Sequence, residues 1–516
     1  MTGPQEFGTA LNAARRSREL DVVSTVADVD VLVIGGGITG VGLALDAASR
    51  GLRTVLVERR DLAYGTSRWS SKLTHGGLRY LASGQFAIAH ESAAERHLLM
   101  TRIAPHLTRP LAQVMPLYRP GHVRRGAYVG AGYLLGDALR RVVRTPSGLL
   151  RAPGALGRDE TSRLLPALRD DDLAGAVRGW DGQVIDDARL VTAVARTAAG
   201  HGAAILTRCA AVAVAGEAAT LRDEATGREF GIRARAIISA AGVWAGELSE
   251  GVHLTPSRGT HLVVDTVRLG GADVSLTVPI PGSSSRFVFT VPAPHGRTYI
   301  GLTDVPTEGE IPEVPVATDP EIDMLLNTVN QVLHTPLTRD DVRGTFAGLR
   351  PLLQGVGSGE TSDLSRQHAV IESDNGVLNV VGGKLTTYRR MAEDGIDEAV
   401  RRRFAPGSVA PSRTRTLPLV GAATRRELAT VPAPARFVRR FGIEAPRVAA
   451  LSAGATASRG VSAQELEWGV VAEGALTIDD LLERRTRLGL VAAEADESRD
   501  AAAAAFARAG VVPLDV

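Results

Sequence analysis

Apolar and polar positions alternate in blocks near the start of the chain, as in a layered α/β protein. Residues 31–34 are a continuous apolar run (VLVI), which is typical of a parallel strand covered on both faces. Glycines follow, and residues 38–50 form an alanine-rich helical pattern that permits close packing on a sheet. A second apolar run, residues 52–58, ends in an acid. The pattern predicts strand, turn, helix and strand.

Three later stretches extend this arrangement. Residues 190–245 predict a helix followed by several strands. Residues 258–305 alternate between polar and apolar positions, which predicts a separate antiparallel sheet. Residues 376–390 again predict a strand, a glycine turn and a helix. The chain is therefore expected to hold one parallel and one antiparallel sheet.

The C-terminal part differs in composition from the body. A Pro/Ser/Arg-rich linker separates the α/β body from an Ala/Arg/Glu-rich region with helical periodicity. We predict an N-terminal extension (1–28), an α/β body (29–404), a linker (405–418) and a C-terminal all-α domain (419–516). Within the body, nucleotide-binding segments are expected near 29–110, 185–250 and 345–404, with a substrate-cap sheet near 251–344.

Composition narrows the class of protein. The 516 residues are 44% hydrophobic and 22% charged, which suits a globular protein with large cores. The net charge of +2 gives no reason to expect nucleic-acid binding. The single cysteine, Cys209, excludes an intramolecular disulfide, a four-cysteine zinc site and a cysteine-ligated iron–sulfur cluster. Redox chemistry would thus need an organic cofactor or a metal without thiolate ligands, and no metal-ligating residues are predicted.

The sequence predicts a cytoplasmic protein with one possible membrane contact. Residues 1–28 lack an apolar run long enough for a secretory signal, and no stretch approaches the ~18 apolar residues of a membrane span. Within 116–144, an 11-residue apolar run (126–136) lies between arginine clusters. This pattern suits either an interfacial helix or a buried helix with basic ends.

A glycine fingerprint follows the first strand. Gly35, Gly37 and Gly40 satisfy G-x-G-x-x-G, which allows a tight turn, close approach of a pyrophosphate, and packing of helix on strand. The helix N-terminus supplies N–H groups and positive dipole to phosphates. Glu58 ends the second strand, where an acid would hydrogen-bond a ribose hydroxyl. These residues predict a Rossmann-like dinucleotide site.

Two later turns favour FAD over NAD. An apolar strand runs into Ala240, Ala241 and Gly242, and a late strand runs into Gly382 and Gly383. An extended dinucleotide needs backbone N–H groups far along the chain, whereas a nicotinamide dehydrogenase does not need this late strand. FAD is therefore the predicted cofactor.

Several stretches resemble the FAD-dependent, quinone-linked glycerol-3-phosphate dehydrogenases. The similarity runs in order from about residue 30 to 490, and is carried by the motifs VIGGGITGVGLALDAASRG, TSRWSSKLTHGGLRYL, DDARL, RGTH, GLTD, GLRPL, GGKLTTYRRMA and TIDDLLERRTRLGL. The resemblance implies a Rossmann-like FAD domain of glutathione-reductase or amino-acid-oxidase type, an antiparallel substrate cap and a helical C-terminal domain.

The resemblance also implies an activity. It implies oxidation of sn-glycerol 3-phosphate to dihydroxyacetone phosphate, with hydride passing from C2 to the flavin and electrons passing on to a membrane quinone. Peripheral attachment to the cytoplasmic face of the membrane then becomes the preferred interpretation of residues 116–144. The oligomeric state stays open, with a homodimer as one option.

That chemistry needs a clamp for a phosphate dianion. Arg350 lies in an apolar context (GLRPL), where a guanidinium needs a partner such as a phosphate or an internal carboxylate. Arg79 follows two glycines, and Arg366 is a weaker candidate. Lys384 stands at a helix start, where the helix dipole disfavours a cation unless an anion is present. Arg350 and Lys384 are predicted to act in both binding and catalysis.

The chemistry also needs a proton acceptor and a positioned flavin. His261 is the predicted base, since its unperturbed pKa lies near 6.5, although a strand histidine can also be a satisfied core residue. The acid pair Asp186 and Asp187 is interpreted as a helix start rather than as a metal or acid–base site. Further residues are predicted to contact the flavin or its phosphates: Ser70, Ser71, Lys72, His75, Thr386 and Thr387.

Rival functions stay open at this point. The same scaffold could serve a flavin oxidase that reduces O2, or an enzyme acting on an amino acid or another small hydroxy substrate. A catalytically silent FAD-binding scaffold is a third alternative. The excess of candidate cations favours a phosphate-bearing substrate over a carboxylate.

Overall fold

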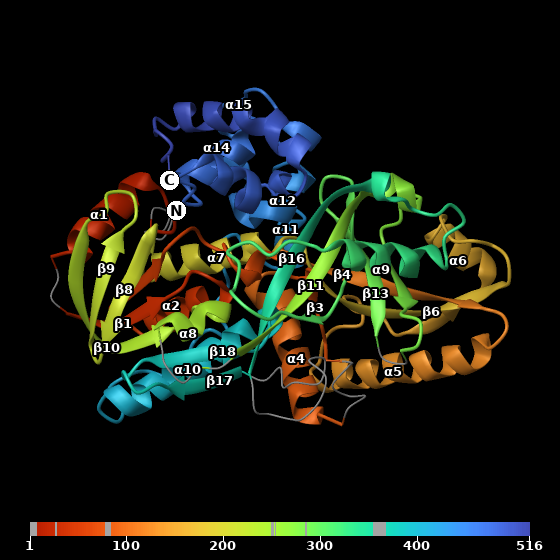
Figure 1. Cartoon of the computed structure of the whole chain (residues 1–516), viewed down its shortest axis with the longest axis horizontal. Helices are drawn as coiled ribbons and strands as arrows, with labels where there is room; N and C mark the ends of the chain where they lie inside the picture. Colours follow the sequence, from red (N-terminus) through yellow and green to blue (C-terminus); the bar gives the residue numbers. More distant parts are fainter. Residues whose placement is uncertain are drawn as a thin grey trace.

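The computed structural model describes residues 8–25, 28–77, 84–248, 252, 254–283, 286–353 and 368–515. Two sheets lie side by side in the body, and the C-terminal helices pack against them (Figure 1). Arg79 and Arg366 fall outside the described residues.

The first sheet carries the predicted strand–turn–helix unit. In the described part of the chain it has eight strands, in the order β17-β18-β10-β1-β2-β7, with β8 and β9 added beside β10. β1, β2, β7, β10 and β18 run parallel, so their carboxyl ends meet at one edge. Its strands are β1 (Asp28–Ile34), β2 (Thr54–Glu58), β7 (Ala204–Thr207), β8 (Cys209–Ala215), β9 (Ala218–Asp223), β10 (Glu229–Ser239), β17 (His368–Glu372) and β18 (Leu378–Gly382).

Helices bury one face of this sheet. α2 (Ile38–Ser49), α7 (Asp187–Gly200) and α10 (Tyr388–Arg403) contribute apolar side chains to one core with β1, β2 and β18. Small residues at the α2 surface let α10 approach: a Cβ at Gly42 would lie 3.0 Å from the Tyr388 ring. α1 (Ala13–Val23) adds Val23 to a second core on the β8–β10 side. The parallel sheet is thus covered as its continuous apolar strands predict.

The second sheet is larger than the sequence indicates. It has ten strands among the described residues, in the order β15-β11-β14-β13-β12-β4-β6-β3, with β16 paired to β11 and β5 to β6. β4 and β6 lie far upstream of the predicted cap region, and β16 overlaps the start of the segment assigned to FAD binding. The strands are β3 (Leu73–Thr74), β4 (Thr108–Tyr118), β5 (Gly154–Leu156), β6 (Leu173–Val184), β11 (Leu254–Asp265), β12 (Ser275–Pro279), β13 (Phe287–Ala293), β14 (Arg297–Gly301), β15 (Val305–Pro306) and β16 (Val342–Leu353).

Helices of the body surround these sheets. α5 packs against β4 and β6 of the second sheet, away from the C-terminal helices (Figure 1). None of the described helices combines the length and the apolar character needed to cross a membrane. The helices are α4 (Phe86–Leu98), a π-helical turn (Leu99–Ile103), α5 (His122–Val142), α6 (Arg158–Leu164), α8 (Ala245–Leu248) and α9 (Asp319–Asn330).

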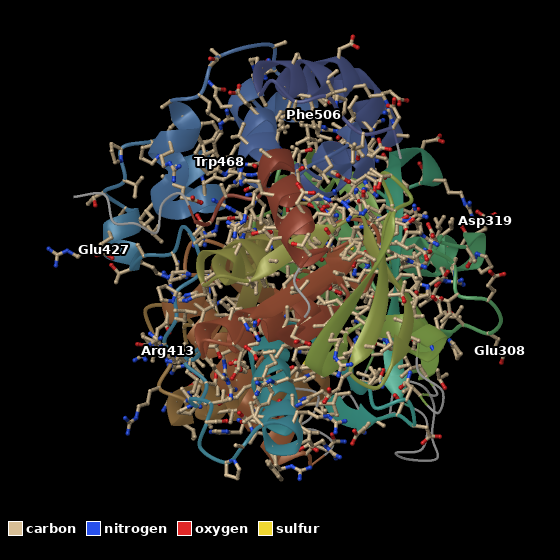
Figure 2. All side chains as sticks on the ribbon, turned by 90° about the vertical axis from the view of Figure 1, so that its left-hand side faces the viewer. Glu308, Asp319, Arg413, Glu427, Trp468 and Phe506 are labelled. Atoms are coloured by element: carbon tan, nitrogen blue, oxygen red, sulfur yellow. The ribbon has the colours of Figure 1, made fainter. Side chains whose placement is uncertain are left out.

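In the described part of the chain after residue 418, helices joined by loops are the main elements, as expected. Trp468 and Phe506 lie inside it, whereas Glu427 points outward (Figure 2). The two aromatic residues belong to two separate apolar clusters that hold the helices together. The helices are α11 (Arg425–Leu428), α12 (Ala435–Phe441), α13 (Ala445–Ala449), α14 (Ala463–Val471), a π-helical segment (Asp480–Arg485) and α15 (Ala492–Arg508).

Candidate active site and cofactor cavity

A cavity of about 840 Å³ is lined by residues of both sheets. Three glycine turns border it, at residues 35–37, 240–242 and 382–383. They follow β1, β10 and β18, which are neighbours in the parallel sheet, so segments far apart in the sequence meet at one edge. Gly35, Gly37, Gly242, Gly382 and Gly383 all line the cavity.

Close packing explains two glycines of the fingerprint, Gly35 and Gly40. Gly35 has φ +110°, and a Cβ there would lie 2.7 Å from the carbonyl oxygen of Ala240. A Cβ at Gly40 would overlap the carbonyl oxygen of Gly35. Gly40 therefore serves the packing of α2 on β1, as the fingerprint predicts, and does not itself line the cavity.

Glu58 lies at the end of β2, in the cavity wall. Its Oε2 accepts the Gly36 N–H at 2.6 Å and its Oε1 accepts the Arg60 N–H at 2.8 Å. Burial raises the pKa of Glu58, and the two N–H donors oppose that shift. The acid is thus held rigidly where the fingerprint expects a ribose.

On the opposite wall, the register of β11 and β16 builds a second surface. His261 is opposite Phe346, Gly259 is opposite Gly348, and Ser257 is opposite Arg350. Because every second residue of a strand points to the same face, His261 and Arg350 share one face, with the glycine pair Gly259 and Gly348 between them. The Arg350 guanidinium lies over Gly259, where a Cβ would overlap it.

His261 is buried and tightly packed. Its Nε2 lies 2.9 Å from the hydroxyl of Ser71, and its ring stacks on Phe346. Burial and the nearby cations Lys72 and Arg350 hold the pKa of His261 well below 6.5. The imidazole is therefore neutral at physiological pH and carries a lone pair.

Arg350 has the internal carboxylate partner that its sequence context allows. Its Nη1 donates to Oδ1 of Asp304 at 2.9 Å and to the Ser257 hydroxyl at 3.3 Å, and its Nη2 donates to the Thr303 carbonyl at 3.3 Å. The side chain is about one-fifth exposed and lines the cavity together with Asp304. An internal carboxylate thus orients a guanidinium that still faces the cavity.

Lys384 follows the third glycine turn and lines the same cavity. Its ammonium donates to the hydroxyl of Ser92 on α4 at 3.1 Å. Thr386 lines the cavity as well, whereas Thr387 does not. The Thr387 hydroxyl donates to the Lys384 carbonyl at 3.3 Å and makes no capping hydrogen bond at the start of α10.

The loop before β3 contributes Ser70 and Ser71 to the cavity wall, and His75 joins them directly after the strand. Lys72 corrects the prediction of direct cofactor contact: it is buried beneath the loop and does not line the cavity. Its ammonium contacts the carbonyls of Arg68 and Ser70 at 3.1 and 2.9 Å and Asp187 at 3.0 Å. Burial lowers the pKa of Lys72 to about 8.

Acidic side chains lie on the buried side of this loop, away from the cavity. Asp186 caps α7 by accepting the N–H groups of Ala188 and Arg189, as its sequence position predicts. Asp181 accepts from Arg96 at 2.6 Å and lies 3.2 Å from Nδ1 of His75. The acid pair at 186–187 is therefore structural.

Several residues that line the cavity are not among those that the sequence predicts. Trp69 and Trp244 line it, and so does Ser67, whose hydroxyl accepts the Ile38 N–H at the start of α2 at 2.9 Å. Cys209 also lies in the wall, and burial raises the pKa of its thiol to about 12, so the thiol stays protonated. The glycines in the motifs RGTH and FAGLR are the one sequence pattern that could have indicated this glycine-lined strand face.

These features fit an extended dinucleotide. Three glycine turns on neighbouring strands, a hydrogen-bonded acid at the end of β2 and a helix N-terminus border one cavity, and the facing sheet places a neutral imidazole beside it. The fold and the cavity together define a flavin-dependent oxidoreductase.

Comparisons with known proteins agree with this class. Residues 30–389 match the FAD dependent oxidoreductase family, and residues 412–509 match the C-terminal domain of alpha-glycerophosphate oxidase. Glycerol-3-phosphate dehydrogenase 1 of Mycobacterium tuberculosis is 51% identical over 93% of this chain and 95% of its own length. Glycerol-3-phosphate dehydrogenase of Mycobacterium leprae is 40% identical over 89% of this chain and 81% of its own length.

A solved structure shares nearly the whole fold. The crystal structure of the glycerol-3-phosphate dehydrogenase from Bacillus halodurans, complexed with FAD, aligns with a TM-score of 0.73 and 26% identity, covering 97% of this chain and 94% of that one. The chain belongs to the FAD-dependent glycerol-3-phosphate dehydrogenase family. FAD is the cofactor of the family.

Proposed function

We propose that this protein oxidises sn-glycerol 3-phosphate to dihydroxyacetone phosphate and delivers the electrons to a membrane quinone. The observation that carries the proposal is the shared strand face of His261 and Arg350, a base and a cation separated by glycines. A small phosphate ester fits such a surface, because the glycines leave room for its carbon skeleton.

The phosphate clamp consists of Arg350 and Lys384. Both line the cavity, and both already have neutral or anionic partners that fix their direction. A guanidinium is suited to bidentate binding of phosphate oxygens, and an ammonium adds a point charge. Arg79 and Arg366 stay further candidates for the clamp.

His261 accepts the proton of the C2 hydroxyl. It is neutral before substrate binds, and Ser71 orients its Nε2 edge. A phosphate dianion beside Arg350 offsets one of the two cations that depress the histidine pKa, so substrate binding itself makes the imidazole a stronger base. Proton acceptance is thereby coupled to the presence of substrate.

FAD, when bound, supplies the acceptor for the C2 hydride. The three glycine turns and Glu58, which line the cavity, would hold its dinucleotide portion, and Ser70, Ser71, His75 and Thr386 would contact its flavin portion. The protein contributes orientation and a wall of apolar side chains that excludes water.

The quinone assignment rests on α5. Its exposed surface carries Val123, Tyr128, Leu134 and Leu135, each more than half exposed, and arginines flank them. Tyr128 and Leu135 also border the cavity, so an apolar path leads from a surface patch to the site. Such a helix suits peripheral insertion at the anionic cytoplasmic face of a membrane, where a quinone can reach the cavity.

An anaerobic visible spectrum of the purified protein tests this proposal. Flavin absorption near about 450 nm should bleach on addition of sn-glycerol 3-phosphate and persist with glycerol or glycine as controls. A quinone analogue should then restore the colour faster than air does. Faster recovery in air would indicate an oxidase, and bleaching by glycine alone would indicate an amino-acid substrate.

A further inference from the structure

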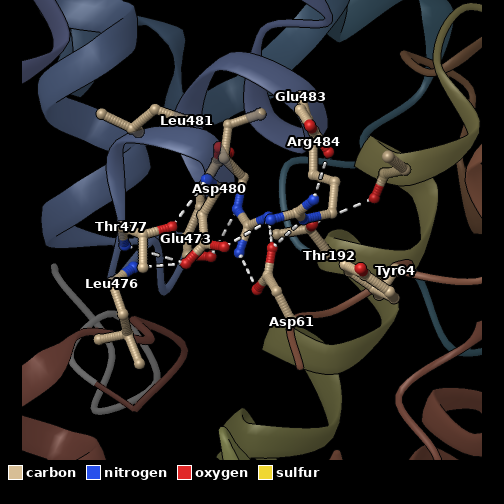
Figure 3. Close-up of polar contacts among 12 residues, drawn as sticks. Asp61, Tyr64, Thr192, Glu473, Leu476, Thr477, Asp480, Leu481, Glu483 and Arg484 are labelled. Atoms are coloured by element: carbon tan, nitrogen blue, oxygen red, sulfur yellow. Dashed lines mark hydrogen bonds and ion pairs between the residues drawn. The ribbon is translucent and has the colours of Figure 1, made fainter. Parts of the chain in front are cut away.

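The C-terminal helices contact the body through buried ion pairs (Figure 3). Asp61, at the start of the loop that leads to the cavity, accepts hydrogen bonds from Arg484 at 2.6 Å and from both terminal nitrogens of Arg485 at 2.8 Å. Asp480 in turn accepts from Arg208 of the body at 2.9 Å. All of these side chains are buried, which ties the beginning of the loop to the C-terminal domain.

Arg487 reaches the far end of the same loop. Its Nη2 donates to the carbonyl oxygen of Arg68 at 2.6 Å, and its guanidinium lies 5.4 Å from the ring centre of Trp69. It also lies 4.0 Å from both Asp186 and Asp187 at the start of α7. The residue is buried and has φ +64°, an uncommon conformation for a residue with a side chain.

The Arg68 carbonyl is thus held by two cations. Arg487 approaches it from the C-terminal domain, and Lys72 approaches it from the loop itself at 3.1 Å. Asp187 completes the arrangement, because it pairs with Lys72 and accepts both the N–H and the hydroxyl of Ser70, at 3.0 and 2.7 Å. The loop backbone is fixed from its buried side.

The other side of the loop faces the cavity. Trp69, Ser70 and Ser71 line it, and the Ser71 hydroxyl lies 2.9 Å from Nε2 of His261. A shift of the loop backbone would therefore move the partner of the proposed base. It would also move the Trp69 ring within the cofactor cavity.

We propose that Arg487 is a positioning residue, through which the C-terminal domain sets the conformation of residues 68–72 and thereby the geometry of the flavin-facing wall. The assignment gives the helical domain a role in the reaction of the neighbouring domain. The part that concerns His261 rests on the proposed function, whereas the ordering of the loop does not.

Hydrogen–deuterium exchange of the FAD-loaded protein tests the ordering directly. In Arg487→Met, amides of residues 66–72 should exchange roughly tenfold faster than in the unmodified protein. Arg196→Met is the matched control, because it removes another buried ion pair between α7 and the C-terminal domain, to Glu444 at 2.8 Å, away from the loop. It should lower thermal stability without changing exchange in 66–72.

Flavin reduction provides the second measurement. Arg487→Met should slow anaerobic bleaching by sn-glycerol 3-phosphate about tenfold to a hundredfold, chiefly through kcat, because a misplaced group costs more in the transition state than in binding. Arg487→Lys keeps a cationic donor for the Arg68 carbonyl and should recover part of the rate. If Arg487→Met does not fold, the rate is measured on Arg487→Lys instead.

The outcomes separate the two proposals. Wild-type exchange in both Arg487 variants, or equal acceleration in Arg196→Met, would overturn the positioning role. If the unmodified protein does not bleach with sn-glycerol 3-phosphate, the proposed function fails, and the exchange experiment still decides the role of Arg487.

Discussion

The imidazole of His261 stacks on the phenyl ring of Phe346, with ring centres 4.6 Å apart and planes inclined by 11°. The two residues are opposite each other on β11 and β16, so the pairing of the strands creates the stack. Lys72 lies 4.4 Å from the same phenyl ring. The proposed base thus lies in an apolar, cation-flanked setting that keeps it neutral.

Substitution of this histidine should separate chemistry from cofactor binding. In His261→Gln, the rate of flavin reduction by sn-glycerol 3-phosphate should fall by about 10² to 10⁴, while the protein keeps its FAD. Stopped-flow bleaching measures the first, and the absorbance ratio of flavin to protein measures the second. A rate within threefold of wild type (roughly 0.7 kcal/mol) would exclude His261 as the base.

The same histidine determines the acid limb of the pH profile. Its neutral form is the active one, and its pKa lies well below 6.5. As the pH falls, kcat/KM should therefore hold through 6.5 and decline only at clearly lower pH, whereas an unshifted histidine would halve the rate near about 6.5. The residual kcat/KM of His261→Gln should not show this decline at low pH.

Substitution of the clamp residues should lower substrate turnover without loss of FAD. Arg350→Ala and Lys384→Ala should each keep FAD and lose steady-state activity by orders of magnitude, because a phosphate dianion loses a charge-assisted partner. Arg339→Ala is the matched control, since Arg339 is an exposed arginine paired with Asp319 and Asp323. Near-normal turnover in both cavity variants would remove them from the clamp.

The sequence predicts the dinucleotide side of the cavity well, because local spacing determines it. The run from β1 to Glu58 and the turn at Gly382 and Gly383 are contiguous patterns whose geometry follows from backbone freedom at glycine. Asp186 was likewise readable as a helix cap from its position before α7.

The facing wall depends on partners far apart in the chain. Nothing in the local sequence shows that β4 and β6 join β12 in one sheet, or that β16 pairs with β11 rather than with the parallel sheet. The sequence does not predict the burial of Lys72 for the same reason, because Lys72 is paired with Asp187, which lies far along the chain. Tertiary pairing, not local propensity, decides these positions.

Glu58 should govern FAD affinity rather than turnover. Glu58→Ala removes an acceptor that also orders the glycine turn through the Gly36 N–H, so FAD should bind about 10- to 100-fold more weakly. Titration of the apoprotein with FAD, followed by flavin fluorescence, measures the change. Saturating FAD should restore flavin reduction by substrate, and a rate that stays low at saturation would contradict this role.

Membrane attachment should depend on the exposed face of α5. The double substitution Leu134→Glu and Leu135→Glu replaces two exposed apolar side chains with charges and should weaken binding to anionic liposomes by tenfold or more (at least ~1.4 kcal/mol). Val22→Glu, at an exposed valine of α1, is the control. Co-sedimentation measures binding, and unchanged binding of the double variant would remove α5 from the contact.

Buried histidines should make the protein lose stability in acid. Burial, with a smaller contribution from Arg189, lowers the pKa of His106 to about 3, against about 6.5 in the unfolded chain. Below pH 6.5 the unfolded state therefore binds a proton that the folded state does not. The stability that His106 contributes is fully present above about 6.5 and declines as the pH falls below it.

A single substitution should flatten this decline. At a pH one unit below 6.5, His106 alone should cost about 1.4 kcal/mol of unfolding free energy relative to neutral pH. His106→Gln should lose less stability between about pH 8 and about pH 5.5 than the unmodified protein, by that amount, in urea unfolding. His334→Gln, at an exposed histidine, is the control. An equal acid loss in His106→Gln would show that His106 takes up its proton in the folded state.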